Sequence, residues 1–258
     1  MEIFHAIVLG IVQGLTEFLP ISSSGHLVLV PWLFKWEDLG LTFDVALHVG
    51  TLFALILYFW KDWLNMFKNW KEPLLWLIAV GCVPAAVFGY KFDKYFETVF
   101  RSPILIASFL IGMGLLLLSA ELFGKKMRQL QAVNLKDSLF IGFAQVLALM
   151  PGVSRSGITM TAGLFAGLTR EGAARFSFLL ATPIVFGAGV LKLKHVAKNG
   201  IPSPEVLPFV LGTVFAAIFG YLAIKYLLKF LQNHTLYVFV WYRLIFGAMI
   251  LLVYLFRA

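Results

Sequence analysis

Two short polar stretches interrupt a chain that is otherwise rich in apolar residues, and both hold groups that could do chemistry. The first reads QGLTEFLPISSSGH over residues 13–26, and the second reads PGVSRSG over residues 151–157. Gln13 and Glu17 are four residues apart, so on a helix their side chains project from one face. Pro20 then ends that helix, because a proline biases the residue before it away from helical dihedral angles. The first stretch therefore presents an amide and a carboxylate just ahead of a turn.

The residues after this turn suit a bound anion. Ser22, Ser23, Ser24 and Gly25 supply hydroxyls and backbone amides at the start of a returning helix. The positive end of the helix dipole attracts negative charge at that position. His26 follows in the first turn of the same helix. A second interpretation, in which Ser22 and Ser24 only cap the helix, stays open at this point.

The second stretch repeats this pattern and adds a cation. Arg155 lies between Ser154 and Ser156, and Gly157 follows. The guanidinium group suits phosphate through its fork of donors. A charge at the centre of a bilayer costs roughly 2.5–3.5 kcal/mol even on a mild insertion scale, so Arg155 and Glu17 need partners or water. The two stretches together predict a site for a polyanion and a divalent metal ion, although Glu17 could instead be a structural partner of a buried arginine.

The composition predicts that these stretches lie within a membrane. Hydrophobic residues make up 60% of the 258 positions and charged residues only 13%, whereas a soluble domain has roughly 45–50% and about 25%. The 21 Lys and Arg residues are scattered among short loops, so nucleic-acid binding is not expected. Apolar runs long enough to cross a bilayer predict six full transmembrane helices at about residues 42–60, 73–90, 103–121, 172–192, 206–228 and 235–256.

Two further apolar segments, residues 3–34 and 138–168, are each broken in the middle by Pro and by Ser and Gly. Each half is too short to span, so each segment is expected to form a re-entrant helical hairpin whose turn lies at membrane depth. The two segments also match at a constant offset of 132 residues: Gly10, Gln13, Ser22, Ser24 and Gly25 precede Gly142, Gln145, Ser154, Ser156 and Gly157.

This internal repeat predicts an all-α integral membrane protein. Residues 1–258 would form a single membrane domain whose halves, about 1–121 and 136–258, are related as an inverted-topology repeat. Three crossings separate the hairpins, so the hairpins open on opposite sides and their turns can meet near the midplane. More Lys and Arg residues lie in the loops opposite the opening of the first hairpin. That bias places the first hairpin on the outer side.

The same residues resemble a known family. GIVQGLTEFLPISSSGH and PGVSRSG, with the supporting stretches FDVALHVGTL, RFSFLLATP and YRLIFG, are similar to motifs of the undecaprenyl-diphosphate phosphatase family, also called the bacitracin-resistance protein family. The resemblance covers the whole chain. It implies hydrolysis of undecaprenyl diphosphate to undecaprenyl phosphate and inorganic phosphate, which recycles the lipid carrier for peptidoglycan and other wall polymers. It also implies a divalent cation, and an active site facing the outer side of the bacterial cytoplasmic (inner) membrane.

The resemblance assigns roles residue by residue. Gln13 and Glu17 occupy the positions of the Glu-or-Gln and Glu of the first motif, Ser23 and His26 match its serine and histidine, and Arg155 matches the arginine of the second. We expect Mg²⁺ or Ca²⁺ to be held by Glu17 and by the amide oxygen of Gln13. Ser23 is the expected nucleophile with His26 as base and acid, and direct attack by water is the competing mechanism.

The remaining expected contacts concern binding. The substrate-binding residues of this interpretation are Gln13, Ser22, Ser24, Gly25, Ser154, Ser156 and Gly157. The expected partners are a polyprenyl diphosphate lipid and the surrounding membrane lipid, and the oligomeric state, with a homodimer as one option, stays open. A transporter or flippase for undecaprenyl phosphate or another anion is the alternative, because paired broken helices in inverted repeat are typical of transporters. The sequence leaves the roles of Asp44, His48 and Arg243 open; Arg243 is either a structural partner in the core or a cation that reaches the membrane interface.

Overall fold

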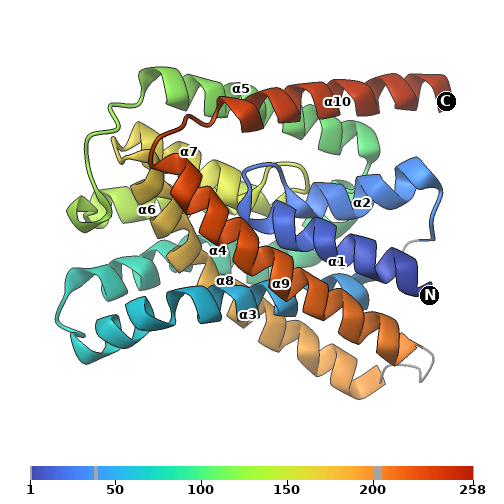
Figure 1. Ribbon diagram of the computed structural model, residues 1–258, viewed down its shortest axis with the longest axis horizontal. Helices are drawn as coiled ribbons and strands as arrows, with labels where there is room; N and C mark the ends of the chain where they lie inside the picture. Colours follow the sequence, from blue (N-terminus) through green and yellow to red (C-terminus); the bar gives the residue numbers. More distant parts are fainter. Residues whose placement is uncertain (1, 38–39, 200–204, 258) are drawn as a thin grey trace.

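The computed structural model describes residues 2–37, 40–199 and 205–257, and the regular structure over this part of the chain is helical. The helices run in the order shown in Figure 1. Their bounds are α1 Ile3–Phe18, α2 Ser23–Phe34, α3 Gly40–Lys68, α4 Pro73–Val99, α5 Pro103–Phe123, η1 Leu130–Ala132, α6 Leu135–Val146, η2 Leu147–Leu149, α7 Arg155–Phe165, α8 Arg170–Asn199, α9 Val206–Leu231 and α10 Tyr237–Arg257.

The six predicted spans are confirmed. Among the described residues, six helices are long and apolar enough to cross a membrane, and they are the ones expected: Thr42–Lys68, Pro73–Phe92, Pro103–Phe123, Arg170–Val190, Val206–Leu231 and Tyr237–Arg257. Apolar residues also cover much of the outside of the molecule, including Phe53, Leu57, Val210 and Ile245. Such a surface is stable against lipid tails. The protein is therefore a multi-pass membrane protein. Residues 38–39 and 200–204, which belong to the two expected halves, lie outside the described residues.

The first broken segment forms two short helices, α1 and α2, joined by a tight turn. Helix α1 ends at Phe18, and Leu19 is extended with ψ 140°, as expected for a residue before proline. Ser22 has φ 77° and caps α2 by accepting a hydrogen bond from the Gly25 amide at 3.3 Å. Figure 1 shows the beginning of α1 at the same end of the molecule as the C-terminus.

The second broken segment reaches a similar turn by a different route. Helix α6 is followed by the short 3₁₀ helix η2, and α7 begins at Arg155. Ser154 has φ 74° and accepts a hydrogen bond from the Gly157 amide at 3.1 Å. The serines that the sequence aligns at the two turns thus adopt the same backbone conformation and make the same cap.

Each hairpin packs its first helix closely against a long helix. A Cβ on Gly10 of α1 would lie 2.4 Å from the carbonyl oxygen of Gly212 in α9, and a Cβ on Gly142 of α6 would lie 2.4 Å from that of Gly81 in α4. Small residues allow such close approach of helix backbones in a membrane. Gly10 and Gly142 are 132 residues apart and their partners Gly81 and Gly212 are 131 apart, so the two contacts use nearly equivalent positions and fix where α1 and α6 end.

Candidate active site

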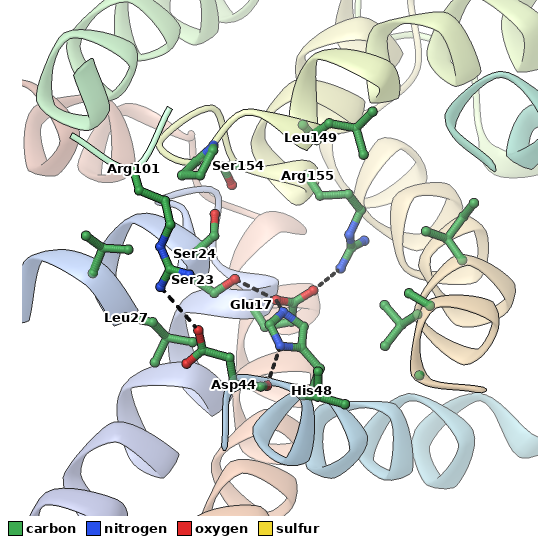
Figure 2. A pocket seen from close by; sticks show the side chains of 18 residues that line it. Glu17, Ser23, Ser24, Leu27, Asp44, His48, Arg101, Leu149, Ser154 and Arg155 are labelled. Atoms are coloured by element: carbon green, nitrogen blue, oxygen red, sulfur yellow. Dashed lines mark hydrogen bonds and ion pairs between the residues drawn. The ribbon is translucent and has the colours of Figure 1, made fainter. Parts of the chain in front are cut away.

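A cavity of about 290 Å³ lies where the ends of the two hairpins meet α3 and α8. Its polar lining combines both predicted motifs with residues from other segments: Glu17, Ser23, Ser24, Asp44, His48, Arg101, Ser154 and Arg155. The rest of the lining is apolar and includes Leu27, Val28, Val45, Leu149, Ile184 and Val185. Figure 2 shows Ser23, His48 and Arg155 around Glu17, and Arg101 directed to Asp44.

Glu17 joins the two hairpins at the cavity. Its Oε1 accepts a hydrogen bond from Nη2 of Arg155 at 2.9 Å, and its Oε2 accepts one from the Ser23 hydroxyl at 2.6 Å. The Glu17 side chain is only 6% exposed and that of Arg155 13%. A buried pair of this kind is strongly destabilised if one partner is lost. The expected meeting of the acidic and basic turns is therefore found, with Ser23 in contact with the carboxylate.

His26 lies elsewhere than expected of a base for Ser23. Its Nδ1 donates to the carbonyl oxygen of Ser22 at 2.7 Å, which leaves Nε2 to accept from the Tyr242 hydroxyl at 2.6 Å. The ring also stacks on Phe246, with centroids 4.8 Å apart, and does not line the cavity. Both ring nitrogens of His26 are thus engaged, Nδ1 at the start of α2 itself and Nε2 with Tyr242 of α10. The hydroxyl of Ser23 points to Glu17 instead.

The expected substrate-binding residues divide into two groups. Ser24 and Ser154 line the cavity. Ser22 does not line the cavity: its Oγ accepts hydrogen bonds from the amides of Gly25 and Gly152 and lies 3.4 Å from the hydroxyl of Ser24. Ser156 donates to the carbonyl oxygen of Leu19 at 3.0 Å.

The capping interpretation therefore accounts for Ser22, and a related one accounts for Ser156, whose hydroxyl fastens the second hairpin to the first. The amides of Gly25 and Gly157 are both satisfied by serine side chains in the same turns. These two glycines keep the turns compact: a Cβ on Gly157 would lie 2.8 Å from Nη1 of Arg243.

Gln13 supports Glu17 from behind. Its Nε2 donates to Oε2 of Glu17 at 3.2 Å, as the four-residue spacing suggested. The side chain is completely buried, it does not line the cavity, and its Oε1 has no hydrogen-bond partner within the described residues. An unpaired buried oxygen is costly unless something else binds it.

Arg243 is a structural partner in the core and not a cation at the membrane interface. Its guanidinium is 1% exposed and donates to the carbonyl oxygens of Pro20, Gly152 and Val153 at 3.0 Å each, and to that of Leu110 at 3.1 Å. The planar fork of arginine can reach several acceptors at once. One side chain from α10 thus fastens both turns together, a role that local sequence does not reveal.

Helix α3 and the segment before α5 complete the cavity. His48 donates from Nδ1 to the carbonyl oxygen of Asp44 at 2.7 Å, and its Nε2 lies 3.7 Å from Oε2 of Glu17. Nη2 of Arg101 lies 3.6 Å from Oδ2 of Asp44. The spacing of Asp44 and His48 is visible in the sequence. No local signal distinguishes Arg101 from the other loop cations.

The arrangement suits phosphoryl chemistry. A hydroxyl hydrogen-bonded to a carboxylate can transfer its proton as it attacks phosphorus. A guanidinium beside it can stabilise the charge on the transferred group. The apolar part of the lining offers a surface for a hydrocarbon chain attached to the phosphate.

Comparison with known proteins agrees with this chemistry. Residues 6–249 match the model of the family described as bacitracin resistance protein BacA. Proteins named undecaprenyl-diphosphatase from Geobacter metallireducens and Moorella thermoacetica are each 51% identical to this chain, covering 98% and 100% of both sequences, respectively. One of the same name from Geobacter sulfurreducens is 52% identical over 97% of this chain and 98% of its own. The chain belongs to the BacA bacitracin resistance protein family.

Proposed function

We propose that the protein hydrolyses undecaprenyl diphosphate to undecaprenyl phosphate and inorganic phosphate. The observation that carries this proposal is the Glu17 carboxylate, which contacts a hydroxyl from its own hairpin and a guanidinium from the other. The names of the relatives supply the substrate. The lipid carrier would thereby be recycled for wall-polymer synthesis, and the same activity would confer bacitracin resistance.

In the proposed mechanism, Ser23 attacks phosphorus while its proton passes to Glu17. A bond forms between the Ser23 oxygen and phosphorus, and the bridging P–O bond of the diphosphate breaks, so that the lipid leaves as its monophosphate. Water then cleaves the phosphoserine, which releases inorganic phosphate and restores the hydroxyl. Arg155 neutralises charge on the phosphoryl oxygens throughout. His26 acts in this scheme by positioning α2, since both its nitrogens have other partners.

Direct attack by water, with Glu17 as base, is the competing route. It differs from the covalent route in its dependence on Ser23. The 2.6 Å contact between the Ser23 hydroxyl and Glu17 favours the covalent route, because the nucleophile already has its proton acceptor.

A divalent cation, Mg²⁺ or Ca²⁺, is part of the proposal. Two neighbouring groups would supply its oxygen ligands: the unpaired Oε1 of Gln13 and the carboxylate of Glu17. Among the described residues no group of three or more His, Cys, Asp and Glu is arranged to hold a metal. Mg²⁺ commonly binds through one or two carboxylates, water and substrate phosphates. When bound, the cation would neutralise phosphate charge, and Gln13→Glu should keep or raise activity and change the preferred metal.

The placement of the site in the membrane is also proposed. We infer that α1–α2 and α6–α7 are re-entrant hairpins in an inverted repeat, within a single domain. The matching serine caps and the matching pairs Gly10–Gly212 and Gly142–Gly81 support this inference. The loop charges support a cavity that faces outward, and membership of the family supports a location in the inner membrane.

Phosphate release from a long-chain prenyl diphosphate by the purified protein in detergent tests the function. We expect release with Mg²⁺ or Ca²⁺, loss with EDTA, and recovery when metal is added back. A flippase of the lipid monophosphate would release no phosphate under any of these conditions. Release unaffected by EDTA would remove the cation from the proposal and leave the hydrolysis in place.

A further inference from the structure

The cavity contains a second arginine–carboxylate pair, Arg101 and Asp44, beside the pair formed by Arg155 and Glu17. Arg101 comes from the connection between α4 and α5, and Asp44 comes from α3. Figure 2 shows the two guanidiniums on either side of the Glu17 carboxylate. The cavity therefore holds two guanidiniums, each paired with a carboxylate.

The two pairs differ in how firmly they are made. Arg155 lies within hydrogen-bonding distance of Glu17 at 2.9 Å, whereas the closest approach of Arg101 to the Asp44 carboxylate is 3.6 Å. That separation exceeds a normal hydrogen bond. The Arg101 and Asp44 side chains are also more exposed, at 31% and 20%. A partly exposed ion pair at this distance is weak, so an anion entering the cavity can compete with Asp44 for the guanidinium.

The position of Arg101 is fixed by the helix that follows it. Helix α5 begins two residues later, at Pro103, and its first turn packs against both hairpin turns. A Cβ on Gly25 would lie 3.1 Å from the side chain of Ile106, and one on Gly152 would lie 2.6 Å from the carbonyl oxygen of Ile106. Arg101 is thus held beside the site by a contact that involves both hairpins.

A diphosphate has two phosphate groups, and a monophosphate has one. Arg155 can serve one of these groups, and part of its donor set is already used by Glu17 and by the carbonyl oxygen of Ser177. A second guanidinium on the opposite side of the cavity would match the second phosphate, because arginine binds phosphate through paired donors.

We propose that Arg101 is the second phosphate anchor of the site. On substrate entry it exchanges Asp44 for the phosphate group that Arg155 does not hold, and the two arginines together select a diphosphate over a monophosphate. Asp44 then holds Arg101 in place when the cavity is empty and opposes binding of anions that cannot displace it. This inference rests on the proposed phosphatase function.

The test compares Arg101→Gln with Arg175→Gln in phosphate release from a prenyl diphosphate. Arg175 is a matched control, because it is 29% exposed, pairs with Asp62 at 2.6 Å and does not line this cavity. Loss of a charged hydrogen-bonding group should raise the KM of Arg101→Gln about 10- to 100-fold and change kcat by only a few-fold. Arg101→Lys should recover part of the loss, and Arg175→Gln should keep the parent KM.

Two further measurements address selectivity and the role of Asp44. Inorganic pyrophosphate should inhibit Arg101→Gln at least about 10-fold more weakly than the parent, while inhibition by inorganic phosphate should change little. Asp44→Asn removes the competing carboxylate, so its KM should fall or stay at the parent value. Loss of folding cannot imitate this result, because it would lower the apparent kcat through the amount of active protein, whereas Arg101→Gln is expected to raise KM and Asp44→Asn is not.

The proposal is overturned if Arg101→Gln keeps the parent KM, loses kcat alone, or loses affinity for phosphate and pyrophosphate equally. It is also overturned if Asp44→Asn loses most of its kcat, because Asp44 would then belong to the reacting group. Failure of the phosphatase function looks different, since the unmodified protein would then release no phosphate at all.

Discussion

The turns that begin α2 and α7 share a backbone and differ in chemistry. Ser22 and Ser154 have φ values of 77° and 74°, and each caps its helix through the amide three residues on. Beside the first turn lie a carboxylate and the Ser23 hydroxyl, and the second turn presents the guanidinium of Arg155. The same backbone conformation thus serves two tasks, and the site needs both copies because neither turn alone holds both the carboxylate and the guanidinium.

The largest effect should come from removing the charge of the second turn. We expect Arg155→Gln to lower kcat about 10³-fold or more, as for arginines that stabilise phosphoryl transfer. The variant also leaves Glu17 without its 2.9 Å partner, which adds a cost in stability. The control is Arg175→Gln, because Arg175 does not line the cavity. Equal rates for the two variants would show that Arg155 takes no part in the reaction.

Loss of the hydrogen bonds by which Arg243 joins the two turns should have the next largest effect. Arg243→Lys keeps a positive charge but cannot reach the carbonyl oxygens of Pro20, Gly152 and Val153 together. We expect a lower thermal unfolding temperature and an activity reduced to a few per cent. Arg257→Lys is the control, because its guanidinium binds the carbonyl oxygens of Trp32 and Leu33 near an exposed helix end, lies over the Trp32 ring, and is not part of either turn. An Arg243→Lys protein as active and stable as this control would contradict the inference that Arg243 holds the two turns together.

The next prediction concerns His26, which lies in the first turn of α2 and contacts Tyr242 of α10. A catalytic base contributes typically about 10²–10⁴-fold in rate, whereas a residue that positions α2 through Tyr242 should contribute less. We expect His26→Gln and Tyr242→Phe each to reduce kcat about 10-fold and to keep the parent pH profile. A loss of 10³-fold confined to His26→Gln, with an altered pH profile, would restore His26 as the base.

An added methyl group where each hairpin packs against its long helix should have the smallest effect, and the loss should be equal for the two hairpins. Gly10→Ala and Gly142→Ala each place a Cβ 2.4 Å from a glycine carbonyl oxygen, so each should reduce stability by roughly 1–3 kcal/mol. Thermal unfolding in detergent measures this loss, and Gly112→Ala is the control, since a Cβ there meets nothing within 4 Å. Unequal losses for the two glycines would break the structural equivalence of the hairpins.

Sequence was sufficient for features that depend on local pattern. The length of apolar runs predicted the six spans, and Pro20 with its serines predicted the first break. The offset between the two motifs predicted that Glu17 and Arg155 would meet, which they do. These inferences succeed because hydrophobic length, proline geometry and helix caps act within a few residues.

Features that depend on distant partners could not be predicted. His26 pairs with Tyr242, 216 residues away, and this choice of partner directs its ring away from Ser23. Arg101 resembles any other loop cation until the first turn of α5 is packed against Gly25 and Gly152. The position of Gln13 behind Glu17 likewise depends on which face of α1 is covered by the rest of the fold.

The reaction of Ser23 tests the central claim, that the nucleophile of one hairpin works with the guanidinium of the other on a single diphosphate. Phosphate release should be measured for the parent and for Ser23→Ala at saturating prenyl diphosphate, with thermal unfolding as the check of folding. We expect the folded Ser23→Ala protein to be at least about 10³-fold slower than the parent, as for removal of a nucleophile. A folded Ser23→Ala protein with a rate within a few-fold of the parent would contradict it.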